Sequence, residues 1–595
     1  MQSYRAPLQD FAFVLDRVLG YEQSIASLPG YEDAGLDTVL DVIAQAAELG
    51  ETVLLPLNTV GDRDGCRFED GAVTTPAGFR EAHQAMVDGG WCGLALDAEV
   101  GGSGLPEVLA VCFEEIICSS NLAFATYPLL TAGAAAALCA HASPEQIARY
   151  VPRLAGGEWS GTMCLTEPQA GTDLGLLTTR AEPDGSGGYR VTGTKIFITA
   201  GEHDMTDQIV HLVLARLPDA PVGTAGISLF IVPRLVVGED GEAGARNTVV
   251  CGSIEHKMGI KGSATCVLHF DAAQAELVGA PHTGMAQMFT MMNRARLGVG
   301  VQGVGIGEIA YQSALAYARE RRQGRAPGTP RGQADPIIVH PDVRRALLRM
   351  RALTEGGRAL ALWVGAEMDI AHRHPDPDRR QEAEDLVALL TPVIKAACTD
   401  NGAEAAGLAI GVYGGHGYIA ESGVEQLARD ARISQIYEGT NGVQALDLVG
   451  RKLPMHQGRL LRRFFHRVDA QLAEGPPAGA EDIHAQLATA FRRLQDATLW
   501  LAAAGLRDPE EAAAAATDYL RLFSLVVFGS LWLRMAAACL GDEAPDAAFC
   551  EQKLATARFF ARRILPETAA LAEMVTSGKS AIAAFGDPAR ERVSA

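Results

Sequence analysis

The chain has 595 residues, of which 48% are hydrophobic and 21% are charged, and its formal net charge is -21. This composition is that of a soluble globular protein with about three to five domain-sized units. The acidic balance argues against a nucleic-acid-binding scaffold, because phosphate binding depends on clustered Lys and Arg. The 11 cysteines form no CxxC pair, so the sequence indicates neither a metal site nor a disulfide framework and favours a reducing compartment, the cytoplasm.

The N-terminal part of the chain is predicted to be helical after a short arm. Residues 1–35 form the arm, and its start lacks the basic and apolar segments of a secretory signal. From Leu36 to about Leu154 apolar residues recur at helical spacing. The glycine-rich stretch 89–106 interrupts this pattern. We expect it to connect two helices rather than bind phosphate, since no strand precedes it and no Gly-Lys-Ser/Thr ends it.

A β-domain is predicted from about Gly161. Short β-branched or alternating runs follow one another there between turn residues, at 189–198, 208–217, 227–232 and 266–270. Two segments carry polar and planar side chains that could face a ligand, namely Thr166, Thr172, Thr199 and Phe197. Together these side chains suit a flat heteroaromatic ring with a phosphate tail, although each threonine alone fits a plain β-forming role.

Helical periodicity returns after the β-domain. The segment 298–303, Gly-Val-Gly-Val-Gln-Gly, matches the GxGxxG template, but no strand precedes it, so two helices in close contact explain the glycines better. The helix ends at Arg321 and Arg322, where the helix dipole favours cations and a phosphate could bind. A proline-broken, charged run with His372 and His374 is interpreted as a solvated loop rather than a metal site.

The segment 433–449 contains the candidate for the chemistry, Glu438. This carboxylate stands between apolar residues and a flexible Gly-Thr-Asn-Gly turn, so it can be both desolvated and aimed, as a general base must be. The alternative is that Glu438 merely precedes a helix capped by Thr440 or Asn441. The core face of that helix would be Val443, Leu446 and Val449.

Beyond Pro454 the pattern predicts a further helical domain. Its most apolar stretch, Leu522 to Leu533, is about a dozen residues long, which is too short to span a bilayer, and is expected to be a buried helix. Arg462, Arg463 and Arg467 are clustered at the start of this domain. We expect a helical bundle that completes a dimer surface, and the cluster is the feature that would support nucleic-acid binding instead.

Several segments of the sequence resemble the acyl-CoA dehydrogenase flavoproteins and stand in the order of that family. They are Leu-Thr-Glu-Pro-x-Ala-Gly-Thr-Asp at 165–173, Gly-x-Lys-x-Phe-Ile-Thr at 193–199, Lys-Met-Gly-Ile-Lys-Gly-Ser at 257–263, Arg-Glu-Arg-Arg-Gln-Gly-Arg at 319–325, Gly-Gly-His-Gly-Tyr at 414–418 with Arg-Asp-Ala-Arg at 429–432, and Tyr-Glu-Gly-Thr-Asn at 437–441. The arm with Tyr-Arg-Ala-Pro at 4–7 and the helical tail look like the long bacterial branch that includes 3-methylmercaptopropionyl-CoA dehydrogenases.

The resemblance implies a mainly α fold with a central all-β domain. An α-helical domain, a β-barrel-like domain and an α-helical bundle would be followed by an extra C-terminal helical domain. The expected boundaries are an N-terminal arm at 1–35, an N-terminal helical domain at 36–160, a β-domain at 161–282, a helical bundle with the catalytic base at 283–455 and a C-terminal helical domain at 456–595.

The resemblance also implies an enzyme of fatty acid β-oxidation, an FAD-dependent acyl-CoA dehydrogenase acting on CH–CH donors. Glu438 would remove the α-proton of an acyl-CoA thioester while the β-hydrogen leaves as hydride to FAD, which gives the trans-2-enoyl-CoA. Contacts to FAD are implied for Thr166, Gly171, Thr172, Phe197, Thr199, Arg321, Gln323, Gly415 and Thr440. Contacts to the substrate are implied for Thr172, Arg296, Tyr437 and Gly439.

Some members of the family carry the base on another helix, immediately before an arginine that matches Arg296. That position is Ala295 here, so no rival carboxylate is present. No second redox centre is visible either, and the resemblance implies an external acceptor, electron-transfer flavoprotein in most of the family. Arg321 and Gln323 would reach the flavin diphosphate of a neighbouring subunit, so a homodimer is expected.

Two alternatives remain at this point. An acyl-CoA oxidase of the same fold would differ in that oxygen reaches the reduced flavin. A flavin-containing nucleic-acid-binding protein with vestigial activity would depend on the basic cluster at the start of the C-terminal domain. The leading expectation includes neither nucleic acid nor a membrane span.

Overall fold

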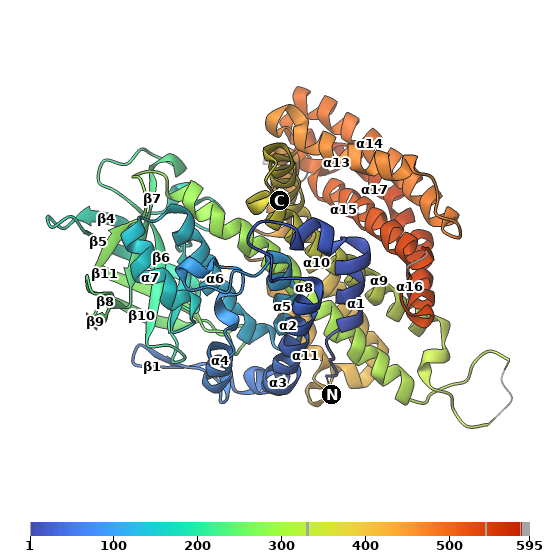
Figure 1. The fold of residues 1–595 in the computed structure, drawn as a ribbon, viewed down its shortest axis with the longest axis horizontal. Coiled ribbons are helices and arrows are strands. Elements are labelled where there is room, and N and C mark those ends of the chain that lie inside the picture. Colours follow the sequence, from blue (N-terminus) through green and yellow to red (C-terminus); the bar gives the residue numbers. More distant parts are fainter. Residues whose placement is uncertain (1, 329–331, 542–543, 584, 586–595) are drawn as a thin grey trace, which may run out of the picture. The chain divides into compact units, whose positions relative to one another are not determined.

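The structure is a computed structural model that describes residues 2–328, 332–541, 544–583 and 585. The chain divides into two compact units, one made of Met1–Asp41 with Val299–Ala595 and the other of Val42–Gly298. Helices occur in both units, and the strands lie in the second (Figure 1). The predicted fold class, mainly helical with a central β-domain and a further helical region at the C-terminal end, is confirmed.

Helices precede the sheet in the unit of residues 42–298. They are α2 (Leu36–Leu49), which begins in the other unit, α3 (Leu55–Asp64), α4 (Phe79–Asp88), α5 (Glu107–Ser120), α6 (Leu122–His141) and α7 (Pro144–Ala155), with the hairpin β1 (Arg67–Glu69) and β2 (Ala72–Thr74) between α3 and α4. A capping box starts α7, because the Ser143 hydroxyl accepts from the Gln146 amide and the Gln146 side chain accepts from the Ser143 amide. The glycine-rich stretch 89–106 connects α4 to α5, as predicted.

A seven-stranded sheet follows in this unit. Its strands are β3 (Trp159–Cys164), β4 (Arg180–Pro183), β5 (Tyr189–Thr199), β6 (Gln208–Arg216), β7 (Ile227–Pro233), β10 (Val249–Ile254) and β11 (Thr265–Leu277). The strand order is β10-β11-β5-β4-β6-β3, and β7 pairs with β11 and β6. The β5–β11 and β6–β7 pairs are antiparallel, whereas β3 runs parallel to β6.

The core of this unit joins α6 and α7 to β6 and β7. Leu138 and Leu154 of the helices belong to one apolar cluster with Leu212, Leu229 and Ile231 of the strands, and all five are fully buried. Both strands are buried along almost their whole length, so they read as continuous apolar runs rather than as alternating ones. This packing fixes the sheet on which the predicted ligand-facing residues stand.

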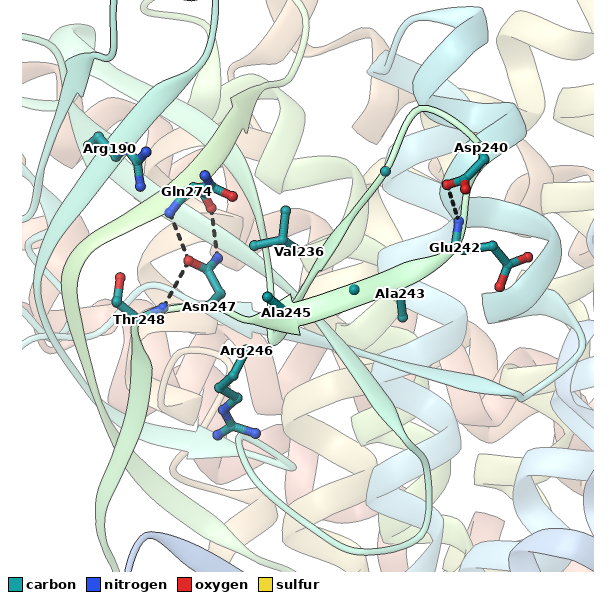
Figure 2. A pocket seen from close by; sticks show the side chains of 12 residues that line it. Arg190, Val236, Asp240, Glu242, Ala243, Ala245, Arg246, Asn247, Thr248 and Gln274 are labelled. Carbon is teal, nitrogen blue, oxygen red and sulfur yellow. Dashed lines mark hydrogen bonds between the residues drawn. The ribbon is translucent and has the colours of Figure 1, made fainter.

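The hairpin β8 (Leu235–Val237) and β9 (Ala243–Arg246) forms a separate two-stranded sheet beside a surface hollow of about 610 Å³. Figure 2 shows that Asn247 closes one wall of this hollow through hydrogen bonds to the backbone of Gln274. Its lining residues lie between Arg190 and Gln274, and none of them is among the residues predicted for the site. The hollow is therefore separate from the predicted site residues of this unit.

The other unit contains a bundle of long helices. They are α8 (Gly284–Glu320), which begins in the unit described above, α9 (Pro341–Arg373), α10 (Pro377–Tyr413), α11 (Val424–Ser434) and α12 (Asn441–Asp447). A Cβ atom on Gly303 of α8 would lie 2.3 Å from the carbonyl oxygen of Cys398, and one on Gly402 of α10 would lie 2.4 Å from the carbonyl oxygen of Gly303. The prediction that glycines allow two helices into close contact here is confirmed, and the residues before them are helical.

The N-terminal residues are packed into this unit by a buried charge cluster. Asp10 of α1 (Leu8–Phe13) accepts from Arg358 of α9 at 2.6 Å and forms an ion pair with Lys553 at 2.5 Å. Burial raises the pKa of Asp10, but Lys553 and Arg358 outweigh burial and hold this pKa below its usual value. Because all three side chains are nearly inaccessible to water, each charge needs its partners.

The C-terminal region forms the helices α13 (Met455–Ala473), α14 (Glu481–Arg507), α15 (Pro509–Leu540), α16 (Ala547–Phe559) and α17 (Thr568–Thr576). The apolar stretch Leu522–Leu533 lies within α15, which has 32 residues. By length and composition, α15 and the 20-residue α6 could cross a membrane, but 83% and 67% of their most apolar windows are buried inside the protein. The prediction of a buried helix is confirmed, since residues from Leu522 to Leu533 form the core of this region.

Two of the three arginines in the basic cluster at the start of α13 form ion pairs. Arg463 pairs with Asp385 at 2.5 Å, and Arg467 pairs with Glu367 and Glu382 at 3.0 Å each. Arg462 donates to the carbonyl oxygen of Gln457. Arg463 and Arg467 join α13 to α9 and α10, so most of the feature that would have supported nucleic-acid binding serves the packing of the helices.

Candidate active site

The predicted site residues are divided between the two units. The unit of residues 42–298 holds Thr166, Gly171, Thr172, Phe197, Thr199 and Arg296, and the other unit holds Arg321, Gln323, Gly415, Tyr437, Glu438, Gly439 and Thr440.

A buried ion pair fixes the first group. Lys195 of β5 and Glu167 of the loop before β4 are 0% and 2% exposed, and Nζ of Lys195 lies 2.9 Å from Oε1 of Glu167. Lys195 also donates to the carbonyl oxygen of Leu165 at 2.9 Å, and the amide of Ile196 donates to the carbonyl oxygen of Thr166 at 2.9 Å. The loop that carries Thr166 is therefore held against the strand that carries Thr199.

The charges of this pair are set by their surroundings. Burial raises the pKa of Glu167, but Lys195 and the hydrogen bonds from Thr178 and Thr179 outweigh burial and lower this pKa to about 2. Burial lowers the pKa of Lys195, and Glu167 opposes part of that shift. Neither residue was singled out from the sequence, although both stand inside the matching segments. The sequence signal that could have indicated this ion pair is a Glu one residue after Thr166 and a Lys two residues before Phe197.

Phe197 projects from a bulge in β5. Ile198 faces Cys266 and Lys195 faces Leu268, so two residues of β5 oppose the single residue Val267 of β11. Phe197 has φ +58°, which a non-glycine residue rarely adopts, and its ring is 60% exposed. Strain of this kind persists where the fold over-determines it, and its effect here is to present a planar ring to the outside.

The other residues of this group differ in exposure. Gly171 and Thr172 are exposed in the loop, and a Cβ atom on Gly171 would meet nothing within 4 Å. Thr199 is half-buried and pairs with Thr265 of β11. Arg296 on α8 is 4% exposed, which is unusual for an arginine and indicates a fixed side chain. An uncrowded backbone at Gly171, threonine hydroxyls and the exposed ring of Phe197 are features that suit a flat cofactor.

The loop of Glu438 joins α11 to α12 in the other unit. Glu438 has φ +56° and Gly439 has φ +83°, so two consecutive residues are left-handed and only one is a glycine. The fully buried side chain of Gln444 donates to the carbonyl oxygen of Glu438 at 3.0 Å and to that of Gly439 at 3.1 Å. These two hydrogen bonds hold the strained backbone and thereby set the direction in which the Glu438 side chain points.

Asn441 anchors the far end of the same loop to α10. Its Oδ1 accepts from the buried Lys395 at 2.9 Å, and its Nδ2 donates to Oδ1 of Asp400 at 2.7 Å. Asp400 also accepts from Gln435, before the loop, at 2.6 Å. The hydroxyl of Tyr437 donates to the Gln302 side chain of α8. The loop is thus fixed by side chains from α8, α10 and α12. The roles of Lys395 and Gln302 were not predicted from the sequence.

Thr440 caps α12, since its hydroxyl accepts from the amide of Val443 at 3.3 Å. The cap predicted in the alternative interpretation is therefore present. The predicted core face was wrong at Leu446, which is 49% exposed, because Gln444 and Ala445 face inward instead. A polar residue takes a core position here because its amide is needed by the loop before the helix.

The remaining predicted residues lie where α8 ends. Arg321 and Gln323 are exposed, and their segment is fixed by backbone bonds from Ile337 to Arg321 and from Gln323 to Asp335. Tyr317 and Tyr413 stack at 4.1 Å and join this end of α8 to α10. The hydroxyl of Tyr317 lies 3.0 Å from Nδ1 of His416, beside the exposed Gly415. The structure therefore brings the Arg321 segment next to the glycine-rich loop of 414–418.

Comparison with known proteins identifies the family. Four family models match the chain in order: the acyl-CoA dehydrogenase N-terminal domain at 66–158, the middle domain at 162–273, the C-terminal domain at 282–453 and an acetyl-CoA dehydrogenase C-terminal-like domain at 464–585. The chain belongs to the acyl-CoA dehydrogenase family. It is 44% identical to 3-methylmercaptopropionyl-CoA dehydrogenase of Ruegeria pomeroyi, over 96% of this chain and 98% of the relative.

Other relatives agree with this assignment. A butyryl-CoA dehydrogenase of Syntrophomonas wolfei is 34% identical over 95% of each chain. The solved structure of an acyl-CoA dehydrogenase of Bacillus anthracis in complex with FAD has the same fold, with a TM-score of 0.74 and 20% identity over 96% of this chain and 92% of that one. The predicted oxidoreductase class and its cofactor, FAD, are confirmed at the level of the family.

The residues of this chain fit FAD. The exposed ring of Phe197 and the hydroxyls of Thr172 and Thr199 suit the flat isoalloxazine ring and its polar edge. At the end of α8, the exposed Arg321 and the uncrowded backbone of Gly415 suit a diphosphate, which needs a cation and close approach of the backbone.

Proposed function

We propose that this acyl-CoA dehydrogenase uses Glu438 to remove the α-proton of a short-chain acyl-CoA and forms the trans-2-enoyl-CoA. The observation that carries this assignment is the loop of Glu438. A non-glycine residue is held at φ +56° by a buried amide, and the loop is anchored at both ends to α10. The cap at Thr440 would not by itself require this strain, and backbone strain of this kind is expected where a functional side chain must point in one direction.

Proton removal at this site requires a base and a stabilised enolate. The carbon next to a thioester carbonyl is weakly acidic, so Glu438 takes its proton while hydrogen-bond donors polarise the carbonyl oxygen. The backbone amide of Glu438 is our candidate donor, with Tyr437 and Gly439 shaping the space around the thioester. An apolar acyl chain that excludes water would raise the pKa of the Glu438 carboxyl and improve its match to the substrate.

FAD, when bound, supplies the acceptor for the hydride that leaves the β-carbon. In our proposal Phe197 and Thr199 hold the isoalloxazine end, with Thr166, Gly171 and Thr172 as further contacts. Arg321 and Gln323 hold the diphosphate of the FAD of a neighbouring subunit, and Gly415 and Thr440 are further contacts to FAD. Thr172 and Arg296 also contact the CoA arm. Support comes from the exposed ring of Phe197 and from the fixed loop that carries Thr166.

The substrate range is proposed from the relatives. The two curated relatives described above are named for 3-methylmercaptopropionyl-CoA and butyryl-CoA, both of which carry short acyl groups. We therefore propose short acyl-CoA thioesters, including methylthio-substituted ones, as substrates. Because the 11 cysteines of the chain form no cluster for iron–sulfur ligation, electrons would pass to an external acceptor, electron-transfer flavoprotein. A homodimer, supported by the exposure of Arg321 and Gln323, is part of this proposal, as is a cytoplasmic location.

Anaerobic bleaching of bound FAD tests the proposed function. A panel of acyl-CoAs from two to twelve carbons, with 3-methylmercaptopropionyl-CoA included, is mixed with the FAD-loaded enzyme, and the loss of flavin absorbance is followed. Short acyl-CoAs should bleach the flavin and yield the 2-enoyl-CoA, and an artificial electron acceptor should restore it without peroxide. Peroxide as the main product would indicate an oxidase. Absence of bleaching by every acyl-CoA would contradict the proposal.

A further inference from the structure

The helix that follows the base loop is too short to be stable alone. α12 has seven residues and continues as a five-residue π-helix, Leu448–Lys452, and isolated helices as short as about 12 residues are marginal in water. Its inward side consists of Gln444 and Ala445, continued by Leu448 and Val449, all of which are buried. α12 packs against α10 on one side and against α15 on another. The C-terminal domain therefore supplies part of the packing around α12, and nothing so far assigns this domain a role in the reaction.

A charged contact reinforces this wall. Nη1 of Arg521 on α15 donates to Oδ1 of Asn401 on α10 at 2.8 Å. Asn401 directly follows Asp400, the carboxylate that accepts from Gln435 before the base loop and from Asn441 after it. Arg521 thus reaches α10 one residue away from the group that holds both ends of the loop.

The orientation of Asn401 shows that this contact constrains α10. Asn401 is 4% exposed, and within the described parts of the chain its Nδ2 has no hydrogen-bond partner. A buried unsatisfied amide is costly, and turning the amide over would point its NH₂ group at a guanidinium that can only donate. The oxygen is therefore committed to Arg521. Arg521 therefore holds Asn401 in one orientation.

Further charges tie the same region together. Nη2 of Arg521 lies 3.8 Å from Glu567, just before α17, and Glu567 accepts from Arg349 of α9 at 2.7 Å. Arg349 also pairs with Glu404 of α10, one turn beyond Asp400. α9, α10, α15 and the start of α17 therefore share one set of partly buried ion pairs. Such groups transmit a displacement, because each of them loses a partner if one helix moves.

We propose that the C-terminal domain positions the catalytic base: α15 supports α12 directly and, through Arg521 and Asn401, holds the part of α10 to which the Glu438 loop is attached. The inference rests on the proposed role of Glu438. Arg521 is a positioning residue, because it acts through Asn401 and α10 and not on the substrate. Small misplacements of a catalytic group lower the rate far more than they weaken binding, so the effect should fall on the chemical step.

Arg521→Met tests this proposal, with Arg521→Lys as the conservative variant and Arg492→Met as the control. Arg492 is exposed on α14 and has only a weak contact, to Thr489 at 3.4 Å, among the described residues. The FAD-loaded enzymes are mixed anaerobically with butyryl-CoA and with its α-deuterated form. For Arg521→Met we expect a roughly tenfold to hundredfold slower bleaching of FAD at saturating substrate, with the concentration for half-maximal rate nearly unchanged. The deuterium isotope effect should rise, because proton removal becomes more rate-limiting. Arg521→Lys should recover part of the rate.

Asn401→Ala provides the second arm, since it removes the same contact without changing α15. It should reproduce the slow bleaching, and the double variant should be little slower than either single one. Wild-type bleaching rates in Arg521→Met and Asn401→Ala would overturn the proposal, as would a loss of FAD binding equal to the loss of rate. These results are separable from a failure of the proposed function, which would show as absent bleaching in the wild-type enzyme or as full activity of Glu438→Gln.

Discussion

Replacement of Gly303 by alanine tests whether the close contact of α8 and α10 supports the base loop. The added Cβ would lie 2.3 Å from the carbonyl oxygen of Cys398 and 2.5 Å from its carbonyl carbon. Both are backbone atoms, so the helices must move apart. Overpacking costs about 1–3 kcal/mol, and the better helix propensity of alanine offsets about 1 kcal/mol. We expect the free energy of unfolding to fall by up to about 2 kcal/mol.

The same change should slow the reaction, because the neighbouring Gln302 accepts a hydrogen bond from Tyr437 next to the base. Gly407→Ala is the matched control: Gly407 lies in α10, the helix that Gly303 of α8 contacts, but its Cβ would meet nothing within 4 Å. That variant should be stabilised by up to about 1 kcal/mol. Urea denaturation gives the unfolding midpoint, and FAD bleaching by butyryl-CoA gives the rate. A Gly303→Ala enzyme with the midpoint and rate of wild type would refute the reasoning.

Three further predictions concern other parts of the structure. Phe197→Ala should weaken FAD binding by roughly two- to tenfold in titrations of the apoenzyme, because a stacking surface is lost, whereas Phe68→Ala should not. The pKa of Glu167 is lowered from 4.5 to about 2, so the stability that its charge provides is fully present above pH 4.5 and is lost as the pH falls toward 2. In Glu167→Gln the unfolding midpoint should therefore fall less steeply with decreasing pH below 4.5. The same pH dependence as in wild type would contradict the pKa shift. Lys553→Met removes one of the cations that pair with the buried Asp10 and should lower the free energy of unfolding by about 3–5 kcal/mol. Lys579→Met, which breaks an ion pair nearer the surface, should have a small effect. Equal effects of the two changes would refute the argument.

The order of helices, strands and helices could be predicted because it depends on local periodicity. The runs of β6 and β7 and the long helices after residue 284 carry patterns that no distant contact needs to complete. The cap at Thr440 was predictable for the same reason, since it involves residues three positions apart. The glycines of 298–303 were informative because the template they match requires a strand that the preceding residues exclude.

Contacts between distant residues could not be predicted in this way. Nothing local indicates that Lys395 would hold Asn441, or that Asp10 would meet Lys553 more than 500 positions later. The burial of Gln444 in place of Leu446 follows from the needs of the loop before it, which propensity does not describe.

The reduction of FAD by substrate in Glu438→Gln tests the central claim most directly. The variant should be yellow, retain FAD and bind butyryl-CoA. Its flavin should bleach roughly 10²–10⁴-fold more slowly than that of wild type in anaerobic single-turnover mixing, which is the contribution of general-base catalysis. Glu421→Gln is the control, because Glu421 is an exposed carboxylate of the same unit. Near-normal bleaching in Glu438→Gln would contradict the assignment of the base.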